Sequence, residues 1–432
     1  MARGISALPL LLALGCANPA RMTPPPHLDF GQDHPDLAMD EPDLAVATDL
    51  AMPDEAMPDQ ATADLAEAPD LAEPDLAPPA GCDDAGTTGH LFLAAAGASN
   101  ALVTSRFDEA SGWSAYQVAN LPSVNEVAET LVAARPLVVA RQGDSTLAAS
   151  FADSCTQDFP SLAAIGFNLK TALRPAALGT DVVFRGNSDT NLYYVYRPST
   201  LWLGPVKQNA MTASSAFALV RFEGELEAYY SNGGNLSFGK IQSVVGGGPA
   251  AQILTLTTSQ PPTAIVDKNG TLHVVFAGSN TNLFWIWRDA NAAWDASHLH
   301  QLCDGQAGCL IDTNLPISLA LDSAGVPVVA WVGKSPQKVF VSKLLSTAGP
   351  QFWDGASAAS GSCSTEDCHT TAGPALATGV GSAALELVFL SNLDGRARHA
   401  RLLPADMGFA WTEPVSIAGP NLVATPALIA EP

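Results

Sequence analysis

Two segments of the chain carry the same arrangement of aromatic and basic residues, and these side chains are well suited to holding a ligand. The segments are NLYYVYR at residues 191–197 and NLFWIWR at residues 282–288. Successive side chains of a strand point to opposite faces, so each segment places two aromatic rings on one face and its arginine on the other. The candidate ligand-binding residues are therefore Tyr194, Tyr196, Arg197, Trp285, Trp287 and Arg288. Aromatic faces beside guanidinium groups suit the C–H surfaces and hydroxyl groups of sugars. The alternative is that these rings pack between neighbouring structural units.

The sequence offers no recognisable catalytic set. It contains no nucleophile elbow, no zinc-protease helix motif, no phosphate-binding loop and no calcium-binding loop of the EF-hand type. Glu225, Glu227 and Glu386 alternate with apolar positions, which predicts that each lies on a solvated strand face. We therefore predict no catalytic residues and expect a non-enzymatic protein. The alternative is a hydrolase of the glycosidase or lyase type whose site carries no familiar motif.

Histidine and cysteine residues leave two further possibilities. His298 and His300 lie on one face of a strand with Cys303 nearby, which could ligate zinc, but disulfides are favoured in an oxidising compartment. We predict neither a metal nor a cofactor. Apart from Cys16, the cysteines form an even set of six: Cys82, Cys155, Cys303, Cys309, Cys363 and Cys368. The close pairs Cys303–Cys309 and Cys363–Cys368 favour short disulfide loops, which leaves Cys82 to pair with Cys155. Other connectivities stay open.

The first 16 residues have the features of an export signal. Arg3 supplies a positive charge, and residues 5–14 are apolar but too short to cross a bilayer as a helix. The stretch ends in Ala13-Leu14-Gly15-Cys16, which resembles the bacterial lipobox. The resemblance implies that Cys16 receives lipid and becomes the mature N-terminus, and Ala17 after it implies the outer membrane. The alternative is an ordinary secretory signal in which Cys16 is incidental.

Residues 17–86 differ sharply in composition from the remainder of the chain. The unit Pro-Asp-Leu-Ala recurs, for example at residues 35–38 and 74–77, and Phe30 is the one aromatic residue of the segment. Between Thr23 and Gly86 there are 17 carboxylates and no Lys or Arg, which accounts for most of the net charge of −23. Repeated proline blocks helix formation, like charges repel, and a core cannot form. We predict a disordered, extended tether. The acidic balance excludes nucleic acid as a partner.

Residues 87–432 are predicted to form one all-β domain, because a pattern of apolar strands repeats through them. Each unit has a first strand that is usually started by proline, a turn, a second apolar strand and a third strand. The clearest copy runs from Pro262 through the turn Asp267–Gly270 to Arg288. First strands are also expected to begin at Pro136, Pro175, Pro316, Pro374 and Pro426, and at Ala216. Units of about 48 residues suit four-stranded propeller blades.

The two ends of the domain each carry half of such a unit. Residues 91–97 look like a second strand without a first, and residues 426–430 look like a first strand without a second. A propeller closes its ring by pairing such fragments, which leaves no open edge. We therefore predict a seven-bladed β-propeller, with six or eight blades as alternatives. A pair of β-sandwiches or a β-solenoid would not explain the split repeat.

The strand layout of residues 88–432 resembles that of fucose-lectin-type and sialidase-type propellers. This resemblance implies binding of sugars in clefts between blades. We expect a monomeric lipoprotein that is exported and anchored by its lipid to the outer membrane, on the cell surface or the periplasmic face. It would present the propeller as a binding module for a glycan or a protein. A purely structural envelope protein without a small ligand is the other alternative.

Overall fold

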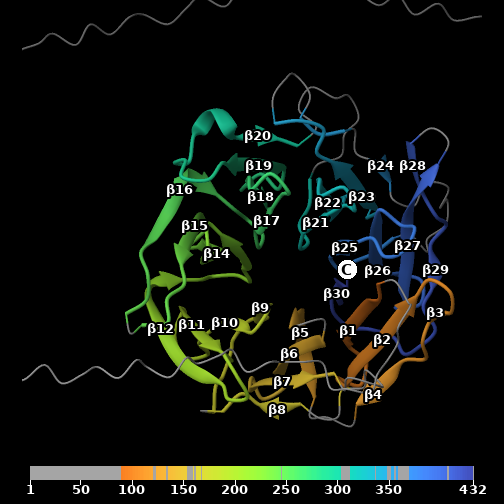
Figure 1. Ribbon diagram of the computed structural model, residues 1–432, viewed down its shortest axis with the longest axis horizontal. Helices are drawn as coiled ribbons and strands as arrows, with labels where there is room; N and C mark the ends of the chain where they lie inside the picture. Colours follow the sequence, from red (N-terminus) through yellow and green to blue (C-terminus); the bar gives the residue numbers. More distant parts are fainter. Residues whose placement is uncertain are drawn as a thin grey trace, which may run out of the picture. The chain divides into compact units, whose positions relative to one another are not determined.

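The computed structural model describes residues 89–431, apart from residues 120–122, 133–134, 153–158, 160–161, 167, 245, 303–311, 336, 348–351, 355–356, 359–368 and 406–407. The expected signal peptide, Cys16, the acidic spacer and the six other cysteines lie outside these described residues. Within them the chain forms seven antiparallel sheets around a central axis (Figure 1), so the predicted seven-bladed propeller is confirmed. No helix in the described part is long and apolar enough to cross a membrane.

The blades are numbered here in chain order, and each is given from the axis outward. Blade one contains β30 (Ala427–Ala430), β1 (Leu91–Ala96), β2 (Leu102–Asp108), β3 (Gly112–Trp113) and β4 (Gln117–Ala119). Blade two contains β5 (Val124–Val132), β6 (Arg135–Gln142), β7 (Leu147–Phe151) and β8 (Ala163–Ala164). Blade three contains β9 (Ala176–Leu178), β10 (Asp181–Arg185), β11 (Asn191–Tyr196) and β12 (Leu203–Thr212). Blade four contains β13 (Ala218–Phe222), β14 (Glu225–Asn232), β15 (Asn235–Lys240) and β16 (Ala250–Thr257).

Blades five to seven repeat this order. Blade five contains β17 (Thr263–Val266), β18 (Leu272–Ala277), β19 (Leu283–Arg288) and β20 (His300–Gln301), with the 3₁₀ turn η1 (Ala296–His298) before β20. Blade six contains β21 (Ser318–Leu321), β22 (Pro327–Val332), β23 (Val339–Lys343) and β24 (Ser357–Ala358). Blade seven contains β25 (Ala375–Thr378), β26 (Leu385–Leu390), β27 (Ala397–Ala405), β28 (Gly408–Trp411) and β29 (Val415–Ser416).

The second strands form the core because their side chains are buried on both faces. In β18 and β22 every residue is buried, and the apolar clusters join each blade to the next. This explains why the second strands are nearly continuous apolar runs rather than alternating ones.

The turn between β17 and β18 has the conformation that its sequence predicts. The Asp267 Oδ1 atom accepts hydrogen bonds from the backbone of Asn269 at 2.8 Å and Thr271 at 2.9 Å, and Gly270 has a φ of +80°.

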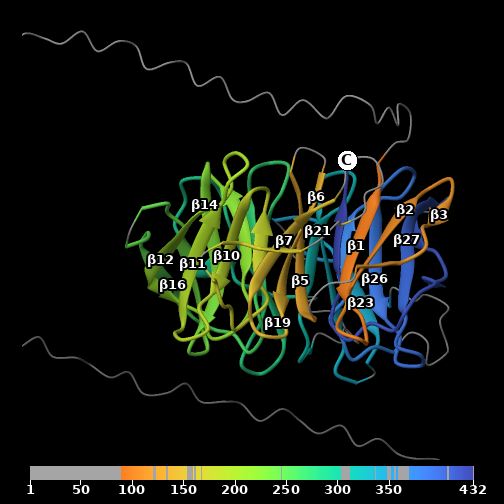
Figure 2. The same ribbon diagram turned by 90° about the horizontal axis from the view of Figure 1, so that it is seen from below.

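The ring closes in blade one as predicted. β30 pairs with β1 in antiparallel register, from Leu91 opposite Ala430 to Ala94 opposite Ala427. Gly89 and Glu431 therefore lie together at the end of the domain where the innermost strands finish. We call this the closure end, and the end where the innermost strands begin the mouth end (Figure 2). The described chain thus starts at the face opposite the mouth end.

Blade two departs from the prediction. Residues 136–140 were expected to form its innermost strand, but they belong to β6, the second strand, and β5 occupies the axis. β5 was missed because its sequence VNEVAETLV carries two glutamates where the other blades have apolar or small residues. The other five prolines were expected to be the first residue of an innermost strand, and each lies immediately before, or two residues before, such a strand. Proline therefore marks the start of most inner strands, but not of this one.

Candidate ligand site at the channel mouth

The innermost strands enclose a cavity at the mouth end of the propeller. Its volume is about 590 Å³, which lies within the ~300–1,000 Å³ common for small-molecule sites. Six blades contribute the beginning of their innermost strand or the residues just before it, and blade two contributes residues from within β5. The contributing segments are residues 126–129, 174–177, 216–219, 261–264, 315–318, 371–376 and 423–428. The cavity is therefore shaped by the whole ring rather than by one blade.

The rim of this cavity is built by a turn that recurs in four blades. In each, a buried threonine hydroxyl donates a hydrogen bond to the backbone carbonyl two residues later, and proline follows three or four residues after the threonine. The bonds run from Thr171 to Leu173 at 2.9 Å, Thr258 to Gln260 at 2.7 Å, Thr313 to Leu315 at 3.4 Å and Thr370 to Ala372 at 3.1 Å. Such local bonds fix the chain where it turns into the channel. The Thr-to-Pro spacing is visible in the sequence, but the prediction of the blades from their apolar strands did not include it.

Three charged residues lie among the described residues of the cavity wall, and all come from blades two and three. They are Glu126 and Glu129 on β5, and Arg174 just before β9. Glu126 accepts a hydrogen bond at its Oε2 atom from Arg141 Nε at 2.7 Å. Within the described chain Arg174 has no hydrogen bond or ion pair; burial lowers its pKa, while attraction to Glu126 opposes that change. Arg174 is therefore a guanidinium group available to a ligand.

Glu129 lies on the face of β5 opposite to that of Glu126. It is opposite Val138 in the ladder, and Val138 packs toward blade one, whereas Thr130 bonds to Gly179 of blade three. The residue as a whole is only partly buried, but its Oε2 atom is enclosed and has no hydrogen-bond partner in the described structure. Because burial disfavours the charged form, the pKa of Glu129 is raised well above its ordinary value. The protonated carboxyl can both donate and accept hydrogen bonds.

Replacing Glu129 by Gln should change how the stability of the domain depends on pH. As pH rises past 4.5, the unfolded chain releases this proton while the folded chain keeps it, so the carboxyl lowers the stability of the fold increasingly up to its raised pKa, and the loss persists at higher pH. Glu129→Gln lacks this titration. At about pH 4 the variant and wild type should unfold at the same temperature, and at about pH 8 the variant should unfold at a higher one.

Thermal unfolding across this range, followed by circular dichroism, measures the difference. The matched control is Glu225→Gln, because Glu225 is an exposed residue at the start of β14. Its pH profile should match that of the wild type. Identical profiles for Glu129→Gln and wild type would show that the carboxyl is ionised normally in the channel.

The aromatic residues predicted as ligand sites pack between blades. The Tyr194 hydroxyl donates to Asp181 Oδ1 at 2.5 Å, and the other carboxyl oxygen of Asp181 accepts from Arg221 of blade four at 2.6 Å. The Tyr196 ring stacks on Tyr194 with centroids 5.2 Å apart. Burial and the bond to Asp181 raise the pKa of Tyr194 well above its ordinary value. This pair therefore joins blade three to blade four.

Trp285 and Trp287 face blade six in the corresponding way. Trp285 is fully buried, and its Nε1 atom donates to His273 Nδ1 at 3.2 Å. The Trp287 ring lies 6.2 Å from that of Trp285 and stacks on His298 at 3.5 Å. His273 is itself buried, and desolvation lowers its pKa despite the nearby Asp267 carboxylate. The signal that would have identified this packing is the polar residue placed just before the second-strand apolar run of each of these two blades, Asp181 and His273.

The two arginines point the other way, as the alternation predicted. Arg288 Nη2 lies 2.9 Å from both carboxyl oxygens of Glu227 in blade four, and its guanidinium lies 4.7 Å from the Phe222 ring centroid. Arg197 donates to the Thr200 carbonyl at 3.1 Å and lies 4.4 Å above the Phe151 ring of blade two. The predicted aromatic and arginine residues of blade three and those of blade five are not brought together, and none of them lines the cavity. Their role in ligand binding stays a prediction.

Two of the three glutamates expected to be solvated are buried. Glu225 is exposed, but Glu227 and Glu386 are fully enclosed, so the prediction for these two was wrong. Glu227 also accepts a hydrogen bond from the Tyr229 hydroxyl, and Glu386 accepts from His399 Nε2 at 2.8 Å and Arg401 Nε at 3.1 Å. Alternation failed as a guide because both faces of a second strand are covered by neighbouring blades.

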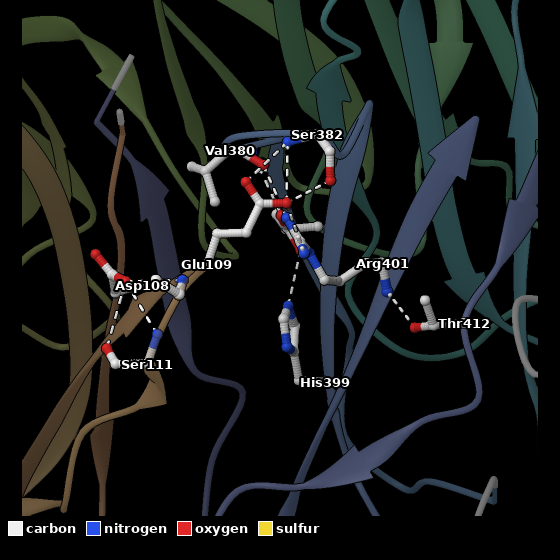
Figure 3. A network of polar contacts seen from close by, with 10 residues as sticks. Asp108, Glu109, Ser111, Val380, Ser382, His399, Arg401 and Thr412 are labelled. Atoms are coloured by element: carbon white, nitrogen blue, oxygen red, sulfur yellow. Dashed lines mark hydrogen bonds and ion pairs between the residues drawn. The ribbon is translucent and has the colours of Figure 1, made fainter. Parts of the chain in front are cut away.

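Glu386 belongs to a polar network that joins the first and last blades, in which Figure 3 labels His399, Arg401 and Glu109. Trp113 of blade one donates through Nε1 to His399 Nδ1 at 3.0 Å, which leaves the imidazole proton on Nε2 for Glu386. Arg401 also lies 3.3 Å from Glu109 of blade one, and Glu109 accepts hydrogen bonds from the backbone and hydroxyl of Ser382 in blade seven. These contacts stabilise the boundary between blades one and seven at the closure end.

The remaining site predictions fall partly outside the described chain. His300 stacks on Phe352 at 3.9 Å, and Cys303, the third residue of the alternative zinc site, lies outside the described residues. In the part that is described, no three His, Cys, Asp or Glu side chains gather as a metal site requires. The disulfide predictions also concern undescribed residues and stay predictions.

Comparisons with known proteins concern the fold. No protein-family model and no curated protein matches the chain. AofleA from Arthrobotrys oligospora is similar in structure, with 13% sequence identity and a TM-score of 0.43 over 71% of this chain and 90% of that one. Apo AztD from Citrobacter koseri has 10% sequence identity and a TM-score of 0.46, over 80% of this chain and 98% of that one. A fucose-specific lectin from Aleuria aurantia has 11% sequence identity and a TM-score of 0.40, over 63% of this chain and 95% of that one. These likenesses concern the fold alone.

Proposed function

We propose that this chain is a membrane-tethered binding module and that the cavity at the channel mouth receives a small glycan. The observation that supports this is the enclosed, unpartnered Glu129 Oε2 atom in a cavity of about 590 Å³. Leaving a buried polar atom without a partner costs about 1–3 kcal/mol, and a ligand hydroxyl would remove that cost. The wall otherwise consists mainly of alanine, proline and other apolar side chains, which suit the C–H faces of a sugar ring.

The tether is the second part of the proposal. Lipid on Cys16 would hold the chain at the outer membrane, and residues 17–86 would act as the spacer. The described chain begins at the closure end, so the spacer would join the propeller on the face away from the cavity.

A glycan array probed with the full chain tests the binding part. Substituting a large side chain into the wall, as in Ala216→Trp or Ala424→Trp, should abolish binding of any glycan that the wild type retains, because both residues line the cavity. The control is Leu201→Trp, which adds the same ring at a position that is 70% exposed and outside the cavity. An array without any retained glycan, or binding that survives both wall substitutions, would refute the cavity as the site.

Fractionation of the same expression cultures tests the tether. The wild type should be recovered with membranes, and Cys16→Ser should be released, because one thioether-linked lipid group is lost with the cysteine. Equal membrane recovery of both proteins would leave no role for lipid on Cys16.

A further inference from the structure

The charges around the cavity do not cancel, and this imbalance indicates the kind of ligand. The Glu126 carboxylate interacts with two guanidinium groups, because Arg141 bonds to it directly and Arg174, on the cavity wall, is attracted to it electrostatically. One negative charge against two positive charges leaves one positive charge. Arg141 is held by Glu126 and does not line the cavity, so the surplus belongs to Arg174.

Glu129 is poorly placed to supply a compensating negative charge. Its Oε2 atom is enclosed and has no hydrogen-bond partner in the described structure, so burial raises its pKa and favours the neutral carboxyl. In this form it offers one O–H donor and an acceptor oxygen to neutral polar groups. β5 separates it from Arg174, so a ligand that meets both must present an anionic group on one side and neutral polar groups on the other.

The rest of the cavity wall restricts the ligand further. It contains no other charged residue among the described ones, and small or apolar side chains such as Ala176, Ala264 and Pro316 recur around it. Arginine is the side chain best matched to carboxylate and other oxyanions, because its planar group can form two parallel hydrogen bonds. A partly buried guanidinium without a partner in the described chain is therefore suited to an oxyanion on a compact, largely uncharged body.

We propose that the cavity is selective for a sugar unit bearing an oxyanion, a carboxylate or a sulfate, with the oxyanion on Arg174 and sugar hydroxyls on Glu129. This rests on the proposed function and adds the ligand class to it. The neutral sugars of the same ring structure lack the group that Arg174 requires.

Titration calorimetry on the full chain tests this with matched sugars. The probes are glucuronic acid, glucose 6-sulfate and glucose, which share one ring and differ in the anionic group. At least one of the two anionic sugars should bind about tenfold or more tightly than glucose. Which of the two binds distinguishes a carboxylate ligand from a sulfate ligand. Arg174→Gln should abolish the preference, because glutamine keeps a polar side chain but loses the charge.

Two further variants separate a binding role from a structural one. Glu129→Leu should weaken binding of anionic and neutral sugars alike, since it removes the hydroxyl partner, whereas Arg174→Gln acts on the anionic sugars alone. The control is Arg396→Gln, which changes an exposed arginine outside the cavity. It should leave every affinity unchanged. Thermal unfolding of each variant establishes that the propeller is folded before affinities are compared.

The outcomes distinguish this inference from the function on which it rests. If glucose binds as tightly as the anionic sugars, or if Arg174→Gln keeps the preference, the oxyanion assignment is wrong, although a glycan whose binding is blocked by Ala216→Trp would still support the proposed function. If neither anionic sugar binds at millimolar concentration while the array retains only neutral glycans, the assignment is likewise wrong. If the array retains nothing, both proposals fail.

Discussion

Truncating the chain after Pro426 should remove several kcal/mol from the free energy of unfolding of the propeller, a large part of the ~5–15 kcal/mol typical of a folded domain. The truncation removes β30, and with it the ladder that covers the inner edge of β1 from Leu91 to Ala94. These residues are almost completely buried in the intact domain and would become an exposed apolar edge. Urea unfolding followed by tryptophan fluorescence measures the loss, and aggregation of the truncated protein is expected with it.

A shorter truncation provides the control. Removing only residues 431–432 keeps all four pairs of β30 and loses the backbone bond from Glu431 to the His90 carbonyl. That bond should be worth about 1 kcal/mol. A synthetic peptide spanning residues 421–432, added to the longer truncation, should restore part of the lost stability by pairing with β1. A truncated protein as stable as the wild type would show that the ring does not depend on its closing strand.

Replacing Arg288 by Met should destabilise the domain by about 3–5 kcal/mol, the usual cost of leaving a buried charge without its partner. Arg288 is the cationic partner of Glu227, whose carboxyl is completely enclosed between blades four and five. The Tyr229 hydroxyl would then be the one remaining side chain that donates a hydrogen bond to the Glu227 carboxylate in the described structure. Chemical unfolding of the variant and the wild type at neutral pH gives the difference.

The double variant Glu227→Leu/Arg288→Met separates charge from packing. Removing both charges with apolar side chains of similar volume is often close to neutral, so this variant should recover most of the stability lost by Arg288→Met. Arg396→Met is the control, because Arg396 is exposed and changes no buried pair. If the double variant loses as much stability as the single one, the guanidinium stabilises the fold through its contacts with Phe222 and Trp294 and not through Glu227.

Much of the fold could be predicted because the repeated strand pattern follows from how blades pack. A second strand such as β18 is buried on both faces, so its apolar run is visible in the sequence, and the split unit at the two ends indicates the closure. Blade two could not be placed in the same way. β5 carries Glu126 and Glu129 at the axis, and a prediction based on apolar pattern passes over such a strand.

The candidate site could not be predicted for a related reason. Glu129 and Arg174 come from different blades, and no spacing in the sequence shows that they share a cavity. The aromatic strands drew attention because they are prominent, yet Tyr194 and Trp285 are prominent as core residues. The polar residue that precedes the apolar run of three second strands is the missed signal: Asp181, His273 and Glu386 each bond to the third-strand ring beside them. The blade that broke the pattern is the one that supplies the carboxyls of the cavity.

The position of β1 within its sheet has a mechanical consequence. β1 is bonded on one side to β30 over four residue pairs and on the other to β2 over six. Hydrogen bonds of an antiparallel ladder run perpendicular to the strands, so tension applied to the chain ahead of Gly89 along the strand loads both ladders in shear. Many bonds then share the force at once, whereas a strand at the edge of a sheet would peel away bond by bond. A domain joined to a support through β1 is therefore held by a strand that is bonded along both edges, and not by an edge strand.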